Sequence, residues 1–194
     1  MGLRADTRTR MIAGGLELVR RNGYSATSFR DVWTLTDTPR GSVYFHFPGG
    51  KEELGLEVIE RHSKAWLTLI SRAADTVDSA DSFLGGLVDG IAVDMRESGF
   101  ELGCAVQAVA VEMSASSETL RQATAECYQQ WTDAVAQRLQ GFSVPPERSR
   151  ALASATVAAL TGALTVARSL RSTEPFDHVA DLLRELARTA GESP

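Results

Sequence analysis

The chain has 194 residues, enough for one compact domain or a small domain joined to a larger one, and hydrophobic residues make up 43% of it. That share supports a real core and excludes a largely disordered chain. The longest apolar run, Ala108–Val111, is far too short to cross a membrane, and the basic, polar segment Met1–Arg10 lacks the apolar stretch of a signal peptide. We therefore expect a cytoplasmic protein with no membrane partner.

Charge is distributed unevenly along the chain. The net charge of −5 by itself argues against a nucleic-acid partner, but residues 1–50 contain seven arginines and four acids, a net of +3. Residues 51–194 have a net charge of −8. A basic first segment on an acidic remainder fits a protein that contacts phosphate with one end only, although chance alone can produce an imbalance of this size.

Helical periodicity dominates the sequence, and strand-like alternation is rare. The first helix is expected over about Asp6–Asn22. A short second helix is expected to follow Thr27 or Ser28, since either hydroxyl can cap it. A third helix is expected after Thr38, with Thr38 as the N-cap and Pro39 in the first helical position, where proline costs no hydrogen bond.

Six further helices are expected after a Pro-Gly-Gly break at residues 48–50. Their approximate ranges are Lys51–Ala74, Ser82–Arg96, Cys104–Met113, Leu120–Leu139, Arg148–Leu170 and Phe176–Thr189. The predicted fold class is therefore all-α with about nine helices, arranged as a three-helix head, residues 1–50, on a larger helical bundle, residues 51–194.

The second and third helices predict a helix-turn-helix. Three short helices within about fifty residues, the last two joined by a tight turn, define that DNA-binding motif. Val43 and Phe47 of the third helix should face inward, against the second helix. The positions that face outward are Arg40, Gly41, Ser42, Tyr44 and His46. This is an unusual surface for a short helix that needs only to be soluble.

The outward residues have chemistry that suits DNA. The Arg40 side chain can pair with both guanine acceptors in the major groove, and Gly41 lets the helix approach the duplex closely. Ser42 and Tyr44 offer hydroxyls to phosphates, and Lys51 adds a positive charge at the start of the next helix. Taken singly, the tyrosine can be a core aromatic, the histidine a packed side chain and the arginine a solvated charge. Their combination at this spacing favours DNA.

Three segments resemble the signature of the TetR/AcrR family of transcriptional regulators: Thr27-Ser28-Phe29-Arg30-Asp31-Val32, Pro39-Arg40-Gly41-Ser42-Val43-Tyr44-Phe45-His46-Phe47 and Lys51-Glu52-Glu53-Leu54. The run from Pro39 to Lys51 is especially similar to the LmrA/YxaF branch. The resemblance implies that most of the matching polar positions face DNA. The predicted DNA-binding set is Thr27, Ser28, Pro39, Arg40, Gly41, Ser42, Tyr44, His46 and Lys51.

The turn of the motif departs from the family pattern. Family members usually have Ala-Gly-Val or Ala-Gly-Ala there, whereas this chain has Thr36-Asp37-Thr38. Aspartate is among the few residues besides glycine that tolerate a left-handed backbone, so the fold should survive at a modest cost. The negative charge of Asp37 near the phosphates should alter affinity or operator preference.

The last two helices are candidates for a dimer interface. A palindromic operator requires a dimer whose recognition helices lie about 34–36 Å, or a multiple of it, apart. The resemblance places a four-helix interface here, and one stripe of small residues permits close approach, although both apolar stripes can instead be intramolecular core. The interface candidates are Leu152, Ala155, Ala159, Gly162, Val166, Leu183 and Leu186.

The middle helices contain large aromatic and methionine side chains with a few polar tips. Such residues are typical of apolar ligand pockets and also of an ordinary core. The resemblance implies a small, largely hydrophobic effector held among them. The effector-pocket candidates are Trp66, Phe83, Met95, Phe100, Cys104, Gln107, Met113, Tyr128 and Trp131. Cys104 and Cys127 lack metal-ligand spacing and are expected to be buried free thiols.

The predicted function is a ligand-responsive transcriptional repressor that binds palindromic double-stranded operator DNA as a homodimer. An effector would release it by tilting the helix that begins at Lys51. Catalysis is disfavoured because the histidines are scattered and no nucleophile elbow or phosphate loop is present, and we predict no cofactor and no metal. An architectural DNA binder would not need about 140 residues of helical bundle, and the segment from Arg40 to Lys51 disfavours a DNA-free interaction protein.

Overall fold

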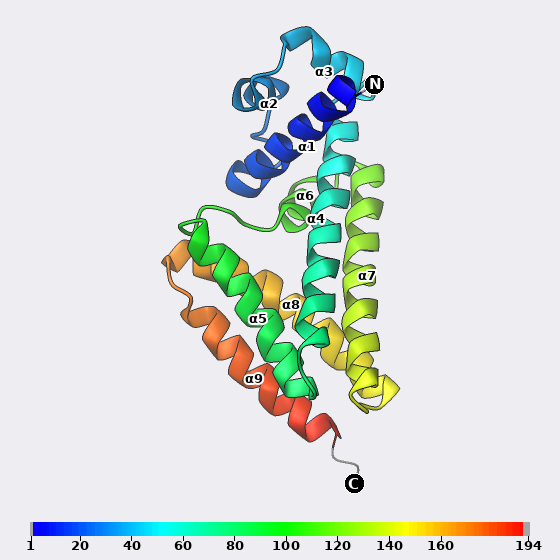
Figure 1. Cartoon of the computed structure of the whole chain (residues 1–194), viewed down its shortest axis with the longest axis vertical. Coiled ribbons are helices and arrows are strands. Elements are labelled where there is room, and N and C mark those ends of the chain that lie inside the picture. Colours follow the sequence, from blue (N-terminus) through cyan, green and yellow to red (C-terminus); the bar gives the residue numbers. More distant parts are fainter. Residues whose placement is uncertain (1, 192–194) are drawn as a thin grey trace. The chain divides into compact units, whose positions relative to one another are not determined.

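The computed structural model describes residues 2–191, which form nine α-helices joined by turns, without a β-strand (Figure 1). In chain order the helices are α1 (Gly2–Asn22), α2 (Phe29–Thr36), α3 (Arg40–His46), α4 (Gly50–Asp75), α5 (Ala80–Glu97), α6 (Ala105–Met113), α7 (Glu118–Gly141), α8 (Pro146–Leu170) and α9 (Glu174–Gly191). The all-α prediction with about nine helices is confirmed.

Most predicted helix ends lie within a few residues of the observed ends, and the start of α3 is the informative difference. The prediction that Thr38 caps this helix is wrong. The N-cap is Pro39, whose backbone is extended (φ −62°, ψ 136°), and it makes no side-chain capping bond. The hydroxyl of Thr38, in the turn, is instead 2.9 Å from that of Thr36, the last residue of α2.

The helices divide into two compact units. Unit 1 contains the chain up to Ser63 together with Cys104–Cys127, and unit 2 contains Lys64–Gly103 together with the chain from Tyr128 onward. Helices α4 and α7 each contribute residues to both units. Unit 1 therefore combines the three N-terminal helices with α6, which begins about eighty residues after the end of α1.

In unit 1, α1 packs against α2 and α6. A Cβ at Gly14 would lie 2.4 Å from Cγ2 of Thr36, so this glycine allows α1 to contact the C-terminal end of α2. The guanidinium of Arg8 lies 5.2 Å from the ring centroid of the buried Phe47 and donates to Glu57 at 2.6 Å. These contacts fix the short helices α2 and α3 on the longer helices α1 and α4.

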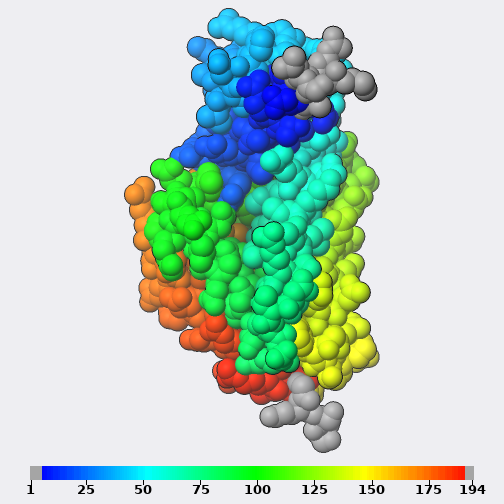
Figure 2. All heavy atoms as spheres, in the orientation of Figure 1, coloured from blue at the N-terminus to red at the C-terminus, as the bar shows by residue number. Residues whose placement is uncertain are grey.

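In unit 2, α9 packs along α5 and α8. Figure 2 shows α9, orange to red, against α5, green. The close approach depends on Gly85, because a Cβ there would lie 2.3 Å from Nε of Arg184. The same arginine donates to Asp89 at 3.3 Å, and Arg188 donates to Asp81 at 3.1 Å. These ion pairs are solvent-exposed and add little stability, so apolar burial supplies most of the packing energy.

Helix α8 is long and apolar enough to cross a membrane by length and composition alone, with a mean hydropathy of 1.4 over its most apolar window. Within unit 2 this helix packs against α9 and α5. A single helix of this kind is weak evidence for a membrane span, because the core helices of many proteins meet the same test.

Candidate nucleic-acid interface

The N-terminus of α2 is fixed by a capping box. The backbone N–H of Asp31 donates to Oγ of Ser28 at 3.3 Å, and the backbone N–H of Ser28 donates to the Asp31 carboxylate at 2.9 Å. The Ser28 hydroxyl also donates to this carboxylate, and these hydrogen bonds hold the pKa of Asp31 below its usual value. The exposed serine and its neighbouring N–H groups are thereby held in one position at the edge of the motif.

The turn between α2 and α3 is left-handed at Asp37. Its backbone has φ 48° and ψ 51°, and its N–H donates to the carbonyl of Trp33. This residue occupies the position where family members usually have glycine, and the expectation that aspartate takes the left-handed conformation there is confirmed. An L-residue in this conformation costs roughly 1–2 kcal/mol, less for aspartate because its short polar side chain can bond locally.

Helix α3 is packed through one face and exposed on the other. Val43 and Phe47 are fully buried, as predicted. The ring of Phe29 from α2 stacks on Phe47 at 6.2 Å and meets the ring of Tyr44 edge-on at 5.8 Å. Tyr44 nevertheless remains 67% exposed. Its ring is therefore held against α2 by one edge and lies mostly in solvent.

The surface of α3 is open at Gly41. A Cβ at this position would meet no atom within 4 Å, and its φ is not in the left-handed range. Neither packing nor backbone conformation within the protein requires glycine here. The guanidinium of Arg40 extends beside it, 5.7 Å from the ring centroid of Trp33. The hydroxyl of Ser42 donates to the carbonyl of Pro39 at 2.6 Å.

Two residues of the predicted set point into unit 1. Thr27 is only 3% exposed, and its hydroxyl donates to the carbonyl of Gly23 at 2.8 Å. The ammonium of Lys51 donates to the carbonyl of Ser25 at 3.0 Å and lies 4.6 Å from the ring centroid of Tyr24. Burial lowers the pKa of Lys51, while the nearby charge of Glu112 raises it. Both side chains hydrogen-bond to carbonyls of the turn between α1 and α2.

Sequence reasoning missed one exposed aromatic residue of α3. Phe45 is 65% exposed, and its ring lies edge-on to that of the half-buried His46 at 5.2 Å. An apolar ring can contact a thymine methyl group in the major groove. In the sequence, a large apolar side chain on an otherwise polar helix face indicates such a contact residue.

The predicted effector-pocket residues are divided between the two units. Cys104, Gln107 and Met113 belong to unit 1, and the other six belong to unit 2. In unit 2 the indole rings of Trp66 and Trp131 stack at 4.3 Å, and the half-buried Tyr128 meets the Trp131 ring edge-on at 5.4 Å. The remaining three in this unit are the buried Phe83 and Met95 and the half-buried Phe100.

In unit 1, Cys104 is the N-cap of α6, and its Sγ accepts from the backbone N–H of Gln107 at 3.4 Å. Burial raises the pKa of Cys104 to about 11, so the thiol stays protonated at neutral pH. Cys104 and Cys127 are buried free thiols, as predicted.

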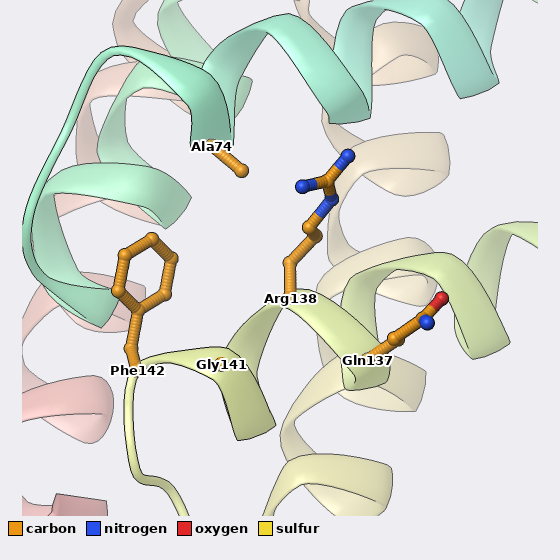
Figure 3. A pocket seen from close by; sticks show the side chains of 5 residues that line it. All are labelled: Ala74, Gln137, Arg138, Gly141 and Phe142. Atoms are coloured by element: carbon orange, nitrogen blue, oxygen red, sulfur yellow. The ribbon is translucent and has the colours of Figure 1, made fainter.

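A cavity of about 490 Å³ in unit 2 has none of these candidates in its lining, but the ring of Phe83 lies 5.9 Å from that of Phe142, which lines it. Figure 3 shows the side chains of Arg138 and Phe142 on either side of it, facing the end of α4 at Ala74. The guanidinium of Arg138 donates to Ser71 at 2.8 Å and pairs with Asp75 at 3.4 Å. This arginine therefore connects α7 to the end of α4.

The predicted interface residues occupy both faces of α8 and α9. Leu152 and Leu183 are buried within unit 2, and Ala159 is half-buried. Ala155, Gly162, Val166 and Leu186 are exposed. An open cavity of about 470 Å³ lies between the two helices. It is lined by Arg148, Ala151, Leu152, Ala155, Leu186, Thr189 and Ala190.

Two family models match the chain. Residues 11–58 match the model of bacterial regulatory proteins of the tetR family, and residues 82–182 match the C-terminal domain of LmrA/YxaF-like transcriptional regulators. The chain is 32% identical over 184 residues to an uncharacterized HTH-type transcriptional regulator of Mycobacterium tuberculosis H37Rv, covering 92% of this chain and 93% of the relative. It belongs to the TetR family.

More distant relatives agree with this assignment. The TetR-family chain is 23% identical to the HTH-type transcriptional regulator LmrA of Bacillus subtilis over 190 residues, 94% of this chain and 97% of the relative. The crystal structure of regulatory protein TetR from Rhodobacter sphaeroides shares its fold, with a TM-score of 0.84, 23% identity, and coverage of 93% of this chain and 98% of that one. The predicted family, its LmrA/YxaF-like branch and its DNA-binding helix-turn-helix are confirmed. The protein is a TetR-family DNA-binding transcriptional regulator.

Proposed function

We propose that this TetR-family regulator is a cytoplasmic repressor that binds palindromic operator DNA as a homodimer and dissociates when it binds a small, largely hydrophobic effector. DNA contact is assigned to residues 1–50, and effector binding and dimerisation to residues 51–194. The observation that supports this most strongly is on the outward face of α3, where neither packing nor backbone conformation requires a glycine at position 41.

The geometry of α3 supports different roles in DNA binding for its different residues. Arg40, exposed at the start of the helix, is assigned to reading a guanine, since its fork matches the two acceptors of that base. Gly41 allows the helix backbone to approach the duplex. The exposed hydroxyl of Tyr44 and the capped N-terminus of α2 at Ser28 are assigned to phosphates, which fix register without reading sequence.

Dimerisation is assigned to the exposed faces of α8 and α9. The exposed face of α8 consists largely of small residues, and the exposed face of α9 adds two leucines, Leu182 and Leu186. An exposed apolar surface of this kind is a typical site of protein association. Small residues on one helix permit a close crossing with the same helix of a second chain, and four such helices form a bundle.

The effector site is assigned to the aromatic cluster of unit 2, at Trp66, Tyr128 and Trp131. Trp131 is fully buried, so its replacement by alanine should cost about 3–5 kcal/mol of stability and would confuse folding with binding. Tyr128 is only half-buried and is the better residue to vary. Tyr128→Ala should weaken the effector response while leaving effector-free DNA binding intact.

The base-reading role of Arg40 is tested by a shift assay on the DNA that flanks the protein's own gene. Arg40→Ala should reduce the preference for this DNA over random duplex by about 1–3 kcal/mol, the typical discrimination of a bidentate arginine–guanine pair. Dimer mass and thermal unfolding should be unchanged. Arg61→Ala, which removes an exposed arginine from α4, is the matched control. If Arg40→Ala keeps the wild-type preference for this DNA over random duplex, Arg40 does not read a base.

A further inference from the structure

Glu112, near the C-terminal end of α6, holds the turn between α1 and α2 through both of its carboxylate oxygens. Oε1 accepts from the backbone N–H of Tyr24 at 3.2 Å, and Oε2 accepts from that of Ser25 at 2.5 Å. Hydrogen bonds to an ionised carboxylate are about twice as strong as those between neutral groups. The two segments are separated by more than eighty residues in the sequence, and both belong to unit 1.

The stability of α6 itself does not explain a glutamate at this position. A negative charge in the last turn of a helix faces the negative end of the helix dipole, which is unfavourable. The side chain is also exposed and buries little apolar surface. Its favourable interactions are those with the α1–α2 turn.

The turn is shaped to receive this carboxylate. Gly23 ends α1 with φ +91°, and a Cβ there would lie 2.3 Å from Oε1 of Glu112. The backbone of Ser25 is bonded at both of its polar groups, because its N–H donates to Glu112 and its carbonyl accepts from the ammonium of Lys51 on α4. One negative and one positive side chain therefore fix the same residue, from α6 and α4 respectively.

A second contact links the same elements. The hydroxyl of Ser117, which precedes α7, donates to Glu52 in the first turn of α4 at 2.5 Å. The segment around the end of α6 is thus connected to the α1–α2 turn and to the start of α4. Ser28, the N-cap of α2, follows Ser25 by three residues, so the position of the turn sets the position of α2 and, through Phe29, of α3.

We infer that Glu112 is a positioning residue that holds the helix-turn-helix in the orientation required by the operator. It acts through the backbone of Tyr24 and Ser25 and does not contact DNA. The inference rests on the proposed binding of a palindrome by a dimer, in which the orientation of each head decides which half-site spacing fits.

The test measures spacing preference, which a merely stabilising residue would not change. The probes are a palindromic duplex selected from a random library by the wild-type protein and the same duplex with one base pair inserted between its half-sites. Fluorescence anisotropy gives the ratio of the two affinities. Glu112→Ala should reduce this ratio by about fivefold or more, a coupling typical of communicating sites. Amide exchange at Tyr24 and Ser25 should become faster.

Two further variants make the result interpretable. Glu126→Ala removes an exposed glutamate from α7 in the same unit and should keep the wild-type ratio. Glu112→Gln retains one acceptor oxygen without the charge, should fold normally, and should give an intermediate ratio. If folded Glu112→Ala and Glu112→Gln keep the wild-type ratio, the inference is overturned. If the wild-type protein selects no palindrome, the proposed function fails and the inference fails with it.

Discussion

The exposed face of α3 in unit 1 and the exposed face of α8 in unit 2 each contain an open glycine, but the side chains around the two glycines differ. Gly41 and Gly162 each lie in a helix without a left-handed backbone, and a Cβ added at either position would have no atom within 4 Å. Glycine in a helix costs about 0.5–1 kcal/mol relative to alanine, so neither is explained by the fold. Arginine, serine and tyrosine lie near the first, and alanine, valine and threonine lie near the second. The proposed function assigns DNA to the first surface and a second copy of the chain to the second.

The largest expected effect comes from placing a charge on the α8 face. A two-fold interface buries the same patch of both chains, so Gly162→Glu should bury two carboxylates, one from each chain. We expect a monomer, and a fall in operator affinity of about 100-fold or more because linked binding of two half-sites is lost. Sedimentation equilibrium and anisotropy measure the two quantities. Gln129→Glu, on the exposed surface of α7, adds the same charge and should remain dimeric. If the Gly162→Glu variant is still a dimer, the interface does not include this face of α8.

The next effect concerns the α3 face. Gly41→Ala should lower operator affinity by about tenfold, because a methyl group that separates helix and duplex weakens contacts worth about 1–3 kcal/mol. The free energy of unfolding should stay the same or rise by up to about 1 kcal/mol. Gly86→Ala on α5 is the matched control, because a Cβ there also meets no atom within 4 Å. It should have no effect on DNA binding. Equal binding by Gly41→Ala and the wild type would mean that α3 does not approach DNA closely.

The smallest effect is expected at the turn of the motif. Asp37→Gly should raise the free energy of unfolding by about 1 kcal/mol, because glycine adopts the left-handed backbone without strain. It should also bind DNA a few-fold more tightly at low salt, about threefold, with the gain fading as salt screens the charge. Asp37→Asn separates the two causes, since asparagine tolerates the backbone and lacks the charge. Weaker binding by both variants would give the aspartate a direct role in contacting the operator.

The sequence predicted the fold well because its signals are local. Apolar periodicity located most of the helices, and a capping hydroxyl at Thr27 or Ser28 located the start of α2, where the cap is Ser28. The family motif then identified the helix-turn-helix. The start of α3 was misplaced because a threonine before a proline fits an N-cap, and only the three-dimensional turn shows that the Thr38 hydroxyl bonds to Thr36.

The parts of the site that the sequence missed depend on distant contacts. The bond from Lys51 to the carbonyl of Ser25 joins residues twenty-six positions apart, whereas the bond from Thr27 to Gly23 is local. Glu112 is an unremarkable surface glutamate until the fold brings it to Tyr24 and Ser25. On α8, apolar periodicity could not decide which face α5 and α9 cover, so the predicted interface set mixed the buried Leu152 with the exposed Ala155.

The proposal that two chains bind one palindrome is tested most directly by the mass of the complex. Sedimentation of the protein with a selected palindromic duplex, and with a duplex that contains one half-site, measures both stoichiometry and affinity. We predict two chains on the palindrome, and an affinity for the half-site lower by about 100-fold or more. One chain per palindrome, with equal affinity for the half-site, would contradict the assignment of DNA binding to α3 and of dimerisation to α8 and α9.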